Sequence, residues 1–209
     1  KGSREITDNY TERQDLDIIL TGEATLRRWN SPYAPTGFYH LKGYVEMILD
    51  RLGISLRSLV VKDADKAWFR EGLAYYSGEN EIVSFGSVSR KYLHVFDIKQ
   101  DVFYAHIDWE NLLKLHKKNK ISFKELPKFP WVRRDLALLV DSSIAFGRIR
   151  QIAFNTEKHL LREVDLFDVY ESDSLGKDKK SYAVSFILRD DNKTLTDNNI
   201  EKIMNSLTS

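Results

Sequence analysis

The side chains in this sequence best suited to chemistry are cations and one aromatic ring that lie at predicted strand ends in the last third of the chain. Guanidinium and ammonium groups contact phosphates, and flat rings stack on exposed bases, so this combination favours RNA binding. A sheet of neighbouring strands is expected to bring them to one edge. The candidate RNA-binding residues are Arg133, Arg134, Tyr170, Lys179, Lys180, Arg189 and Lys193. A second interpretation stays open, in which Arg134 forms an ion pair with the adjacent Asp135.

Other kinds of chemistry have little support in the residue pattern. The sequence contains no glycine-rich phosphate loop, no Gly-x-Ser-x-Gly elbow and no His-Glu-x-x-His helix. Its five histidines never occur at the spacing of metal ligands, and it has no cysteine. Asp63-x-Asp65 and Asp190-Asp191 could hold a hard cation, but no glycine turn or closing glutamate accompanies them. We therefore predict no catalytic residue and no metal site.

The composition is that of a globular protein without a strongly basic field. The 209 residues are 42% hydrophobic and 12% aromatic, with a formal net charge of +1. Residues 1–120 carry 18 basic and 17 acidic side chains, and residues 121–209 carry 14 of each. A polyanion would therefore be bound by a local patch, or jointly with other chains. The absence of cysteine and of a long apolar run fits a cytoplasmic protein, and the start at Lys1 leads us to expect a fragment of a longer chain.

The clearest element in the first part of the chain is a helix that ends before Gly53, a residue typical of helix C-termini. Its apolar residues recur at steps of three and four, which predicts one buried face. The stripe can belong to the core alone, or it can also meet a partner subunit, in which case Leu41, Tyr44 and Ile48 are the interface candidates. Between residues 56 and 105 the pattern predicts short antiparallel strands, and a short helix follows near Trp109.

A basic stretch at residues 116–120, followed by Pro127 and Pro130, predicts a domain boundary between residues 120 and 121. The second domain is predicted to contain strands at 135–140, 164–170 and 180–188 and a helix at 145–160. A last helix is expected to begin after Thr196, a natural N-cap. The order βαββα is one strand short of the ferredoxin-like βαββαβ unit.

Five short motifs of the second domain, in this order and spacing, resemble the ferredoxin-fold anticodon-binding domain of the bacterial phenylalanyl-tRNA synthetase beta subunit family. The motifs are Phe129-Pro130, Arg133-Arg134-Asp135, the run 167–170 (Phe-Asp-Val-Tyr), Lys179-Lys180-Ser181 and the run 193–197 (Lys-Thr-Leu-Thr-Asp). The upstream part is similar to the catalytic-like module of the same family at Gly22, Trp29, Phe38-Tyr39, Leu41-Lys42-Gly43, residues 82–88 and Asp108-Trp109. Residues 68–72 depart from the family pattern, so a lineage-specific loop is expected there.

The resemblance implies an α+β protein with two domains. Residues 1–120 would form a class II synthetase-like antiparallel sheet with helices, and residues 121–209 a ferredoxin-like βαββα(β) domain. It further implies a class II aminoacyl-tRNA synthetase of (αβ)₂ composition, in which the alpha subunit carries the chemistry and the holoenzyme uses ATP and Mg²⁺. This fragment would be non-catalytic and hold no cofactor. Its implied partners are the alpha subunit and tRNA(Phe), whose anticodon stem region the second domain would bind.

Two other functions remain open. The fragment could be an assembly scaffold without direct RNA contact, which the balanced charge of residues 121–209 favours. Alternatively, the second domain could be a ferredoxin-like regulatory module that binds an amino acid. Such a module should have a glycine-rich turn between its first strand and helix, whereas this chain has Asp141-Ser142-Ser143 there.

Overall fold

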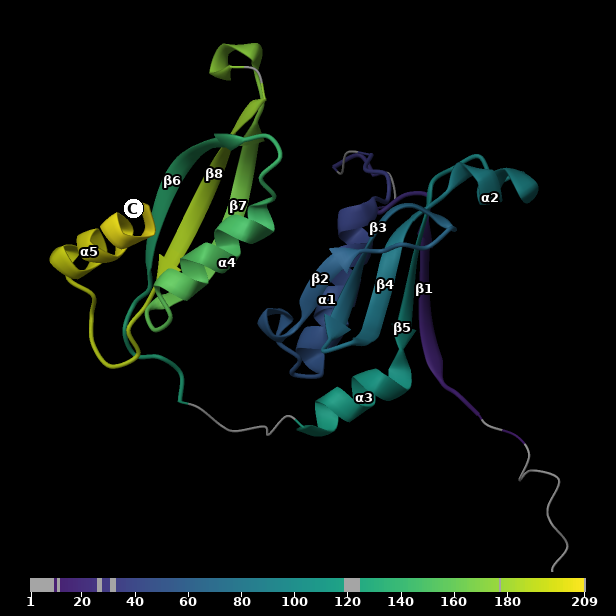
Figure 1. Ribbon diagram of the computed structural model, residues 1–209, viewed down its shortest axis with the longest axis horizontal. Helices are drawn as coiled ribbons and strands as arrows, with labels where there is room; N and C mark the ends of the chain where they lie inside the picture. Colours follow the sequence, from purple (N-terminus) through teal and green to yellow (C-terminus); the bar gives the residue numbers. More distant parts are fainter. Residues whose placement is uncertain are drawn as a thin grey trace, which may run out of the picture. The chain divides into compact units, whose positions relative to one another are not determined.

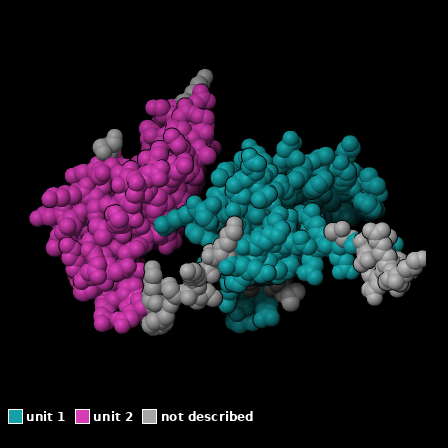
Figure 2. All heavy atoms as spheres, turned by 60° about the horizontal axis from the view of Figure 1, so that its bottom comes forward, with its two compact units in different colours: residues 1–122 teal, residues 123–209 magenta. Residues whose placement is uncertain are grey.

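The computed structural model describes residue 10 and residues 12–25, 28–30, 33–118, 125–176 and 178–208. Contacts within the chain divide it into two compact units, residues 1–122 and 123–209, coloured teal and magenta in Figure 2. The predicted boundary at residue 120 lies two residues before this division. Residues 119 and 120, the end of the predicted linker, lie outside the described residues. Each unit has its own sheet and its own apolar core (Figure 1).

Unit 1 is a five-stranded antiparallel sheet in the order β1-β5-β4-β3-β2, and α1 and α3 pack on one of its faces. Its elements are β1 (Asp15–Thr21), α1 (Phe38–Arg51), η2 (Leu56–Ser58), β2 (Val60–Asp63), β3 (Phe69–Ser77), β4 (Asn80–Val88), α2 (Arg90–Val95), β5 (Val102–Asp108) and α3 (Trp109–Lys118). The predicted helix near Trp109 is confirmed as α3, whereas the sequence pattern missed α2.

Helix α1 supplies most of the helical side of the unit 1 core. Leu41, Val45 and Leu49 are completely buried and pack with strand residues such as Phe85, while Leu112 adds a contact from α3. The helix ends as its sequence predicts. Gly53 has a φ of 70°, a conformation that costs a glycine little, and its N–H donates to the carbonyl of Asp50 at 2.8 Å.

The face of this sheet opposite α1 is shaped by a close approach of β3 and β4. A Cβ on Gly86 would lie 2.4 Å from the carbonyl oxygen of Glu71, and a Cβ on Gly72 would lie 2.7 Å from that of Phe85. The ring of Phe69 covers both glycines and is nearly buried. The expected loop at residues 68–72 is therefore wrong for residues 69–72, because these residues form the start of β3 with a register shift after Phe69.

Unit 2 is a three-stranded antiparallel sheet in the order β6-β8-β7 with two helices on one face. Its elements are β6 (Val132–Asp141), α4 (Phe146–Thr156), β7 (Leu161–Tyr170), η3 (Asp173–Leu175), β8 (Lys179–Leu188) and α5 (Asp197–Thr208). In Figure 1, α4 lies against β7 and β8. The core joins Ala153 of α4 and Ile200 of α5 to Val184 and Phe186 of β8. The predicted α+β class and the ferredoxin-like βαββα order are confirmed.

Candidate functional sites: an apolar groove and the surface of unit 2

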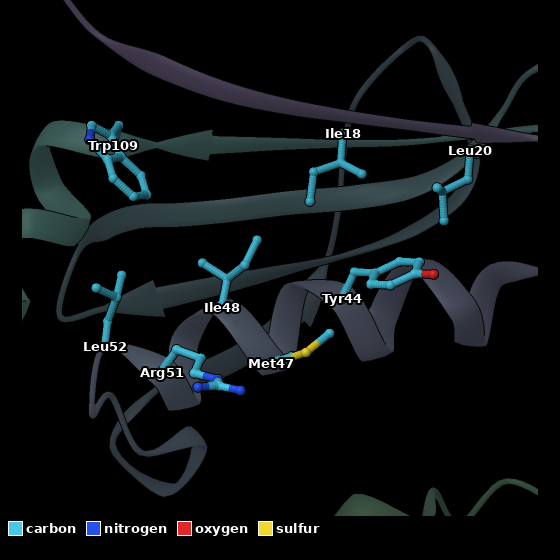
Figure 3. Close-up of a pocket in the computed structure, with 8 residues that line it drawn as sticks. All are labelled: Ile18, Leu20, Tyr44, Met47, Ile48, Arg51, Leu52 and Trp109. Carbon is cyan, nitrogen blue, oxygen red and sulfur yellow. The ribbon is translucent and has the colours of Figure 1, made fainter.

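The first candidate site is an open apolar groove on unit 1, with a volume of about 560 Å³. Three elements far apart in the sequence build it, namely β1, α1 and the first residue of α3. Figure 3 shows Tyr44 and Ile48 extending from α1 toward the strands. The lining residues are Ile18, Leu20, Tyr44, Met47, Ile48, Arg51, Leu52 and Trp109. Arg51 is the one charged side chain among them, so the groove suits an apolar surface with a single acidic contact.

The structure separates the three interface candidates of α1. Tyr44 and Ile48 line the groove, and Tyr44 is 48% exposed. Leu41 has no exposed surface, because it points into the core with Val45 and Leu49. Leu41 therefore cannot contact a partner directly. The sequence pattern missed Met47, which is 48% exposed and lines the groove beside Ile48.

The seven candidate RNA-binding residues do not share one edge of the unit 2 sheet. Arg133 pairs with Ile187 near the beginning of β6 and the end of β8, and Arg189 follows directly. Lys179 pairs with Asp141 at the other end, and Tyr170 pairs with Ser181. Strands of this length separate the two ends by about 30 Å. The expectation of a single edge is wrong, because antiparallel pairing places the ends of successive strands alternately at opposite ends of the sheet.

At the end of the sheet that carries the arginines, each arginine candidate is engaged with a carboxylate. Arg133 Nε lies 2.8 Å from Asp135 Oδ1, and its guanidinium stacks 5.2 Å from the ring centre of Phe167. The bond to Asp135 raises the pKa of Arg133.

The other two arginines make similar pairs. Arg134 Nη2 lies 3.8 Å from Asp197 Oδ1, and Arg189 Nε lies 3.0 Å from Asp191 Oδ1. The ion-pair interpretation of Arg134 thus holds, but with Asp197 instead of the adjacent Asp135. Strand alternation also turns Arg133 and Arg134 to opposite faces of the sheet. Lys193 lies in the segment between β8 and α5.

The opposite end of the sheet holds Tyr170, Lys179 and Lys180. Lys180 Nζ donates to the carbonyl of Ser142 at 2.7 Å and lies 4.8 Å from the ring centre of Tyr182. Tyr182 in turn donates to the carbonyl of Ile144 at 2.9 Å, so this end is fastened to the segment before α4. Tyr170 is 53% exposed and could stack on a base.

Helix α4 carries two cations that the sequence analysis did not single out. Arg148 Nη1 donates to Oε1 of Gln151 at 3.2 Å, and the guanidinium of Arg150 lies 6.0 Å from the ring centre of Phe154. No acidic side chain occurs in the helix from Phe146 to Thr156. That absence of carboxylates is visible in the sequence, and it would have identified these cations as candidates for binding an anion.

A polar network crosses β1 and β5 on the face of unit 1 opposite α1. The carboxylate of Asp17 accepts a hydrogen bond from the Tyr104 hydroxyl at 2.7 Å and lies 2.9 Å from His106 Nδ1. The bond from Tyr104, followed by the contact with His106, lowers the pKa of Asp17. Burial, followed by the bond to Asp17, raises the pKa of Tyr104 to about 12. Tyr104 thus stays protonated and links the two strands.

Within the described ranges, no three His, Cys, Asp or Glu side chains converge in a way that could hold a metal ion. Among the helices of the same ranges, none has the length and hydropathy needed to cross a membrane.

Comparison with known proteins gives two family matches. Residues 3–109 match the family described as the phenylalanyl tRNA synthetase beta chain CLM domain, and residues 127–209 match the ferredoxin-fold anticodon binding domain. The phenylalanine–tRNA ligase beta subunit of Bacteroides thetaiotaomicron is 44% identical over 99% of this chain and 25% of its own length. The Porphyromonas gingivalis beta subunit is 40% identical over 93% of this chain and 24% of its own length.

The chain therefore spans about a quarter of the length of the curated relatives it matches. Among solved structures, a pyrrolysyl-tRNA synthetase from Desulfitobacterium hafniense aligns with 54% of this chain and 45% of its own, at 12% identity. Its TM-score of 0.33 is too low to inform the fold.

Proposed function

Since the chain belongs to the phenylalanyl-tRNA synthetase beta-chain family, we propose that it is part of a phenylalanine–tRNA ligase beta subunit and supports ATP-dependent aminoacylation of tRNA(Phe). Unit 1 binds the alpha subunit, and unit 2 binds the anticodon stem region of the tRNA. The observation that carries this proposal is the match of residues 127–209 to an anticodon-binding domain, directly after a beta-chain module in the same chain.

The groove on unit 1 supports a protein partner for this unit. Tyr44 and Met47 are each 48% exposed although they are large and apolar, and they lie beside the apolar side chains of β1. Exposed apolar surface gathered into one concave site is typical of protein interfaces, and a helix of a partner fits such a groove through side chains spaced by three and four residues. We propose that the alpha subunit occupies the groove and that two such pairs form the (αβ)₂ assembly.

The chemistry of aminoacylation is proposed to lie in the alpha subunit, and the fragment itself is proposed to be non-catalytic. ATP would supply the adenylyl group that activates the amino acid, with pyrophosphate as the leaving group, and Mg²⁺ would balance the charge of the phosphates. One observation supports this assignment: on the open face of the unit 1 sheet, the ring of Phe69 fills the space above Gly72 and Gly86. ATP and Mg²⁺ are accordingly assigned to the holoenzyme and not to this chain. The assembly is proposed to be cytoplasmic.

The contact of unit 2 with tRNA is supported by the family match more strongly than by charge. The ion pairs of Arg133, Arg134 and Arg189 favour one rival, an assembly scaffold without RNA contact, because a paired guanidinium has less to offer a phosphate. In the proposed function, the seven candidates and the rest of the unit 2 surface contact the RNA through local patches.

A deletion in the assembled enzyme tests the proposal against this rival. The alpha subunit is combined with the full-length beta subunit, or with a beta subunit that lacks residues 123–209. Binding of tRNA(Phe) is then measured at two salt concentrations, with size-exclusion chromatography to check assembly. We expect the deleted complex to assemble, to lose affinity for tRNA(Phe) and to show a weaker salt dependence. An intact complex with unchanged affinity would establish unit 2 as a scaffold.

A further inference from the structure

The outer face of α4 carries a cation on a helix that has no acidic residue. Arg148, Gln151 and Asn155 follow one another at steps of three and four residues and are all exposed, so they form one ridge along the helix. Arg150, two positions after Arg148, lies on another side of the helix and is half-buried. A phosphate that approaches this ridge meets no carboxylate from the helix itself.

The two arginines of α4 are also in a different chemical state from those at the sheet end. Arg148 bonds to the neutral amide of Gln151, and Arg150 lies over the ring of Phe154. Within the described part of the chain, neither forms an ion pair with a carboxylate. A guanidinium paired with a carboxylate gains less from a phosphate, because the carboxylate offsets its charge and occupies part of its donors, whereas one on an amide or a ring keeps its full charge. The α4 arginines are thus better prepared for an anion.

The remaining charges of unit 2 reinforce this difference between its two faces. Lys180 brings its ammonium group to Ser142, just before α4, where it lies near the carboxylate of Asp141. Strand pairing places Asp135 and Asp165 on either side of Ser185, on the face of the sheet opposite α4. Glu163 lies one row away, opposite Ile187. Three carboxylates of unit 2 therefore lie on the face of the sheet opposite α4, whereas the charged residues of α4 itself are all cations.

We infer that α4 binds the sugar-phosphate backbone of RNA, with Arg148 on its outer ridge and Arg150 on a flank of the helix. Arg148 and Arg150 contact phosphates, and the amides of Gln151 and Asn155 bond to phosphate or ribose oxygens, which are the usual partners of these side chains in nucleic-acid complexes. The inference rests on the proposed function, in which unit 2 binds tRNA(Phe), and it adds the surface that does so. Such contacts fix the position of the RNA without reading its sequence.

The test compares two pairs of substitutions in the alpha–beta complex with full-length beta subunit. One variant is Arg148→Gln/Arg150→Gln on α4, and the comparison variant is Arg133→Gln/Arg189→Gln at the sheet end, which removes the same formal charge. Binding of tRNA(Phe) is measured at about 50 and 200 mM salt. We expect the α4 pair to weaken binding about tenfold at the lower salt and to reduce the slope of log affinity against log salt by about 1.5 to 2. The comparison pair should lose less than half as much on a logarithmic scale.

Further variants separate the possible failures. Arg148→Lys/Arg150→Lys keeps both charges and should recover most of the affinity, and thermal unfolding checks that each variant is folded. If deletion of residues 123–209 weakens binding but the α4 pair does not, the inference is wrong while the proposed function stands. If neither change weakens binding, both fall. An equal loss in the two pairs of substitutions would also overturn the assignment to α4.

Discussion

Helices α1 and α4 present the same local architecture with opposite outer faces. Each lies on one face of an antiparallel sheet and buries a stripe of small or aliphatic side chains, such as Leu49 in α1 and Ala153 in α4. Away from the core, α1 exposes Tyr44 and Met47, whereas α4 exposes Arg148 and Gln151. The buried stripe determines how each helix packs within its own unit, and the exposed face determines which kind of partner the helix can bind.

The two outer faces differ in how they interact with water in the isolated chain, because one is apolar and the other is charged. Water around Tyr44, Met47 and Ile48 can be released only when another apolar surface covers the groove, so α1 gains from a protein partner. The cations of α4 are well hydrated, and they gain from a polyanion that releases counterions on binding. The comparison thus supports the proposal of a protein partner for unit 1 and a nucleic acid for unit 2.

The largest expected effect distinguishes the inner from the outer face of α1. Leu49 is completely buried in the core, so Leu49→Ala should lower the free energy of unfolding by about 2–5 kcal/mol. Met47→Ala, two positions earlier on the open side of the helix, should change it by less than about 1 kcal/mol. Chemical denaturation of the 209-residue chain measures both. A large loss with Met47→Ala would show that the groove residues belong to the core.

The second prediction tests whether α1 and α4 bind different partners. Met47 on α1 and Ile152 on α4 are matched in exposure, at 48% and 49%. Met47→Asp should weaken assembly with the alpha subunit by about 30-fold or more, because it places a charge in an apolar interface. Ile152→Asp should leave assembly unchanged and should instead weaken tRNA(Phe) binding, because it adds a negative charge to the α4 ridge. Analytical ultracentrifugation and tRNA binding report the two effects, and an exchange of the two phenotypes would reverse our assignment of partners.

Local patterns predicted most of the fold. The period of α1 and its end at Gly53 depend on residues within a few turns of one another, and both are confirmed. The strands and helices of unit 2 likewise follow from alternation and from the Thr196 cap, which accepts from the N–H of Asn199. The fold class was therefore within reach of periodicity and turn chemistry.

The sites were harder to predict, because they depend on residues that are distant in the sequence. The groove forms only where Ile18 and Trp109 lie beside α1, and no local sequence pattern predicts that these residues come together. We predicted that Arg133 and Lys180 lie at one edge of the sheet, but this prediction ignored the antiparallel register, which places them at opposite ends. By contrast, strand alternation alone could have shown that Arg133 and Arg134 face opposite sides.

A pH titration tests the hydrogen bond between Tyr104 and Asp17 on the face of the unit 1 sheet opposite α1. Burial and the bond to Asp17 raise the pKa of Tyr104 to about 12, above the ordinary tyrosine value of about 10. The stabilisation from this group is therefore complete below about pH 10 and is lost as the pH rises toward 12. Asp17→Asn should lower the pKa of Tyr104, which NMR of the labelled ring measures. An unchanged value would mean that the carboxylate contributes little and that burial alone sets it.

The smallest expected effect comes from replacing an exposed glycine of α1 or α4 by alanine, which tests whether any atom lies close to the outer face of each helix. A Cβ on Gly43 in α1, or on Gly147 in α4, would have nothing within 4 Å. Because glycine loses more chain entropy on folding than alanine, Gly43→Ala should stabilise the isolated chain by about 0.5–1 kcal/mol. Gly147→Ala, in the first turn of α4, should add less. Thermal denaturation measures both, and a destabilised Gly43→Ala would show that α1 already packs against part of its own chain there.

Gly43 also reports on the partner, because it lies one turn before Met47 on the same side of α1. The added methyl group meets no atom of the isolated chain within 4 Å, so a loss of affinity for the alpha subunit would come from a clash with the partner's own surface. A loss would place the partner's backbone against Gly43, and unchanged affinity would limit the contact to the groove. The equivalent change at Gly147 cannot discriminate in this way, because long phosphate-binding side chains hold an RNA backbone away from the helix.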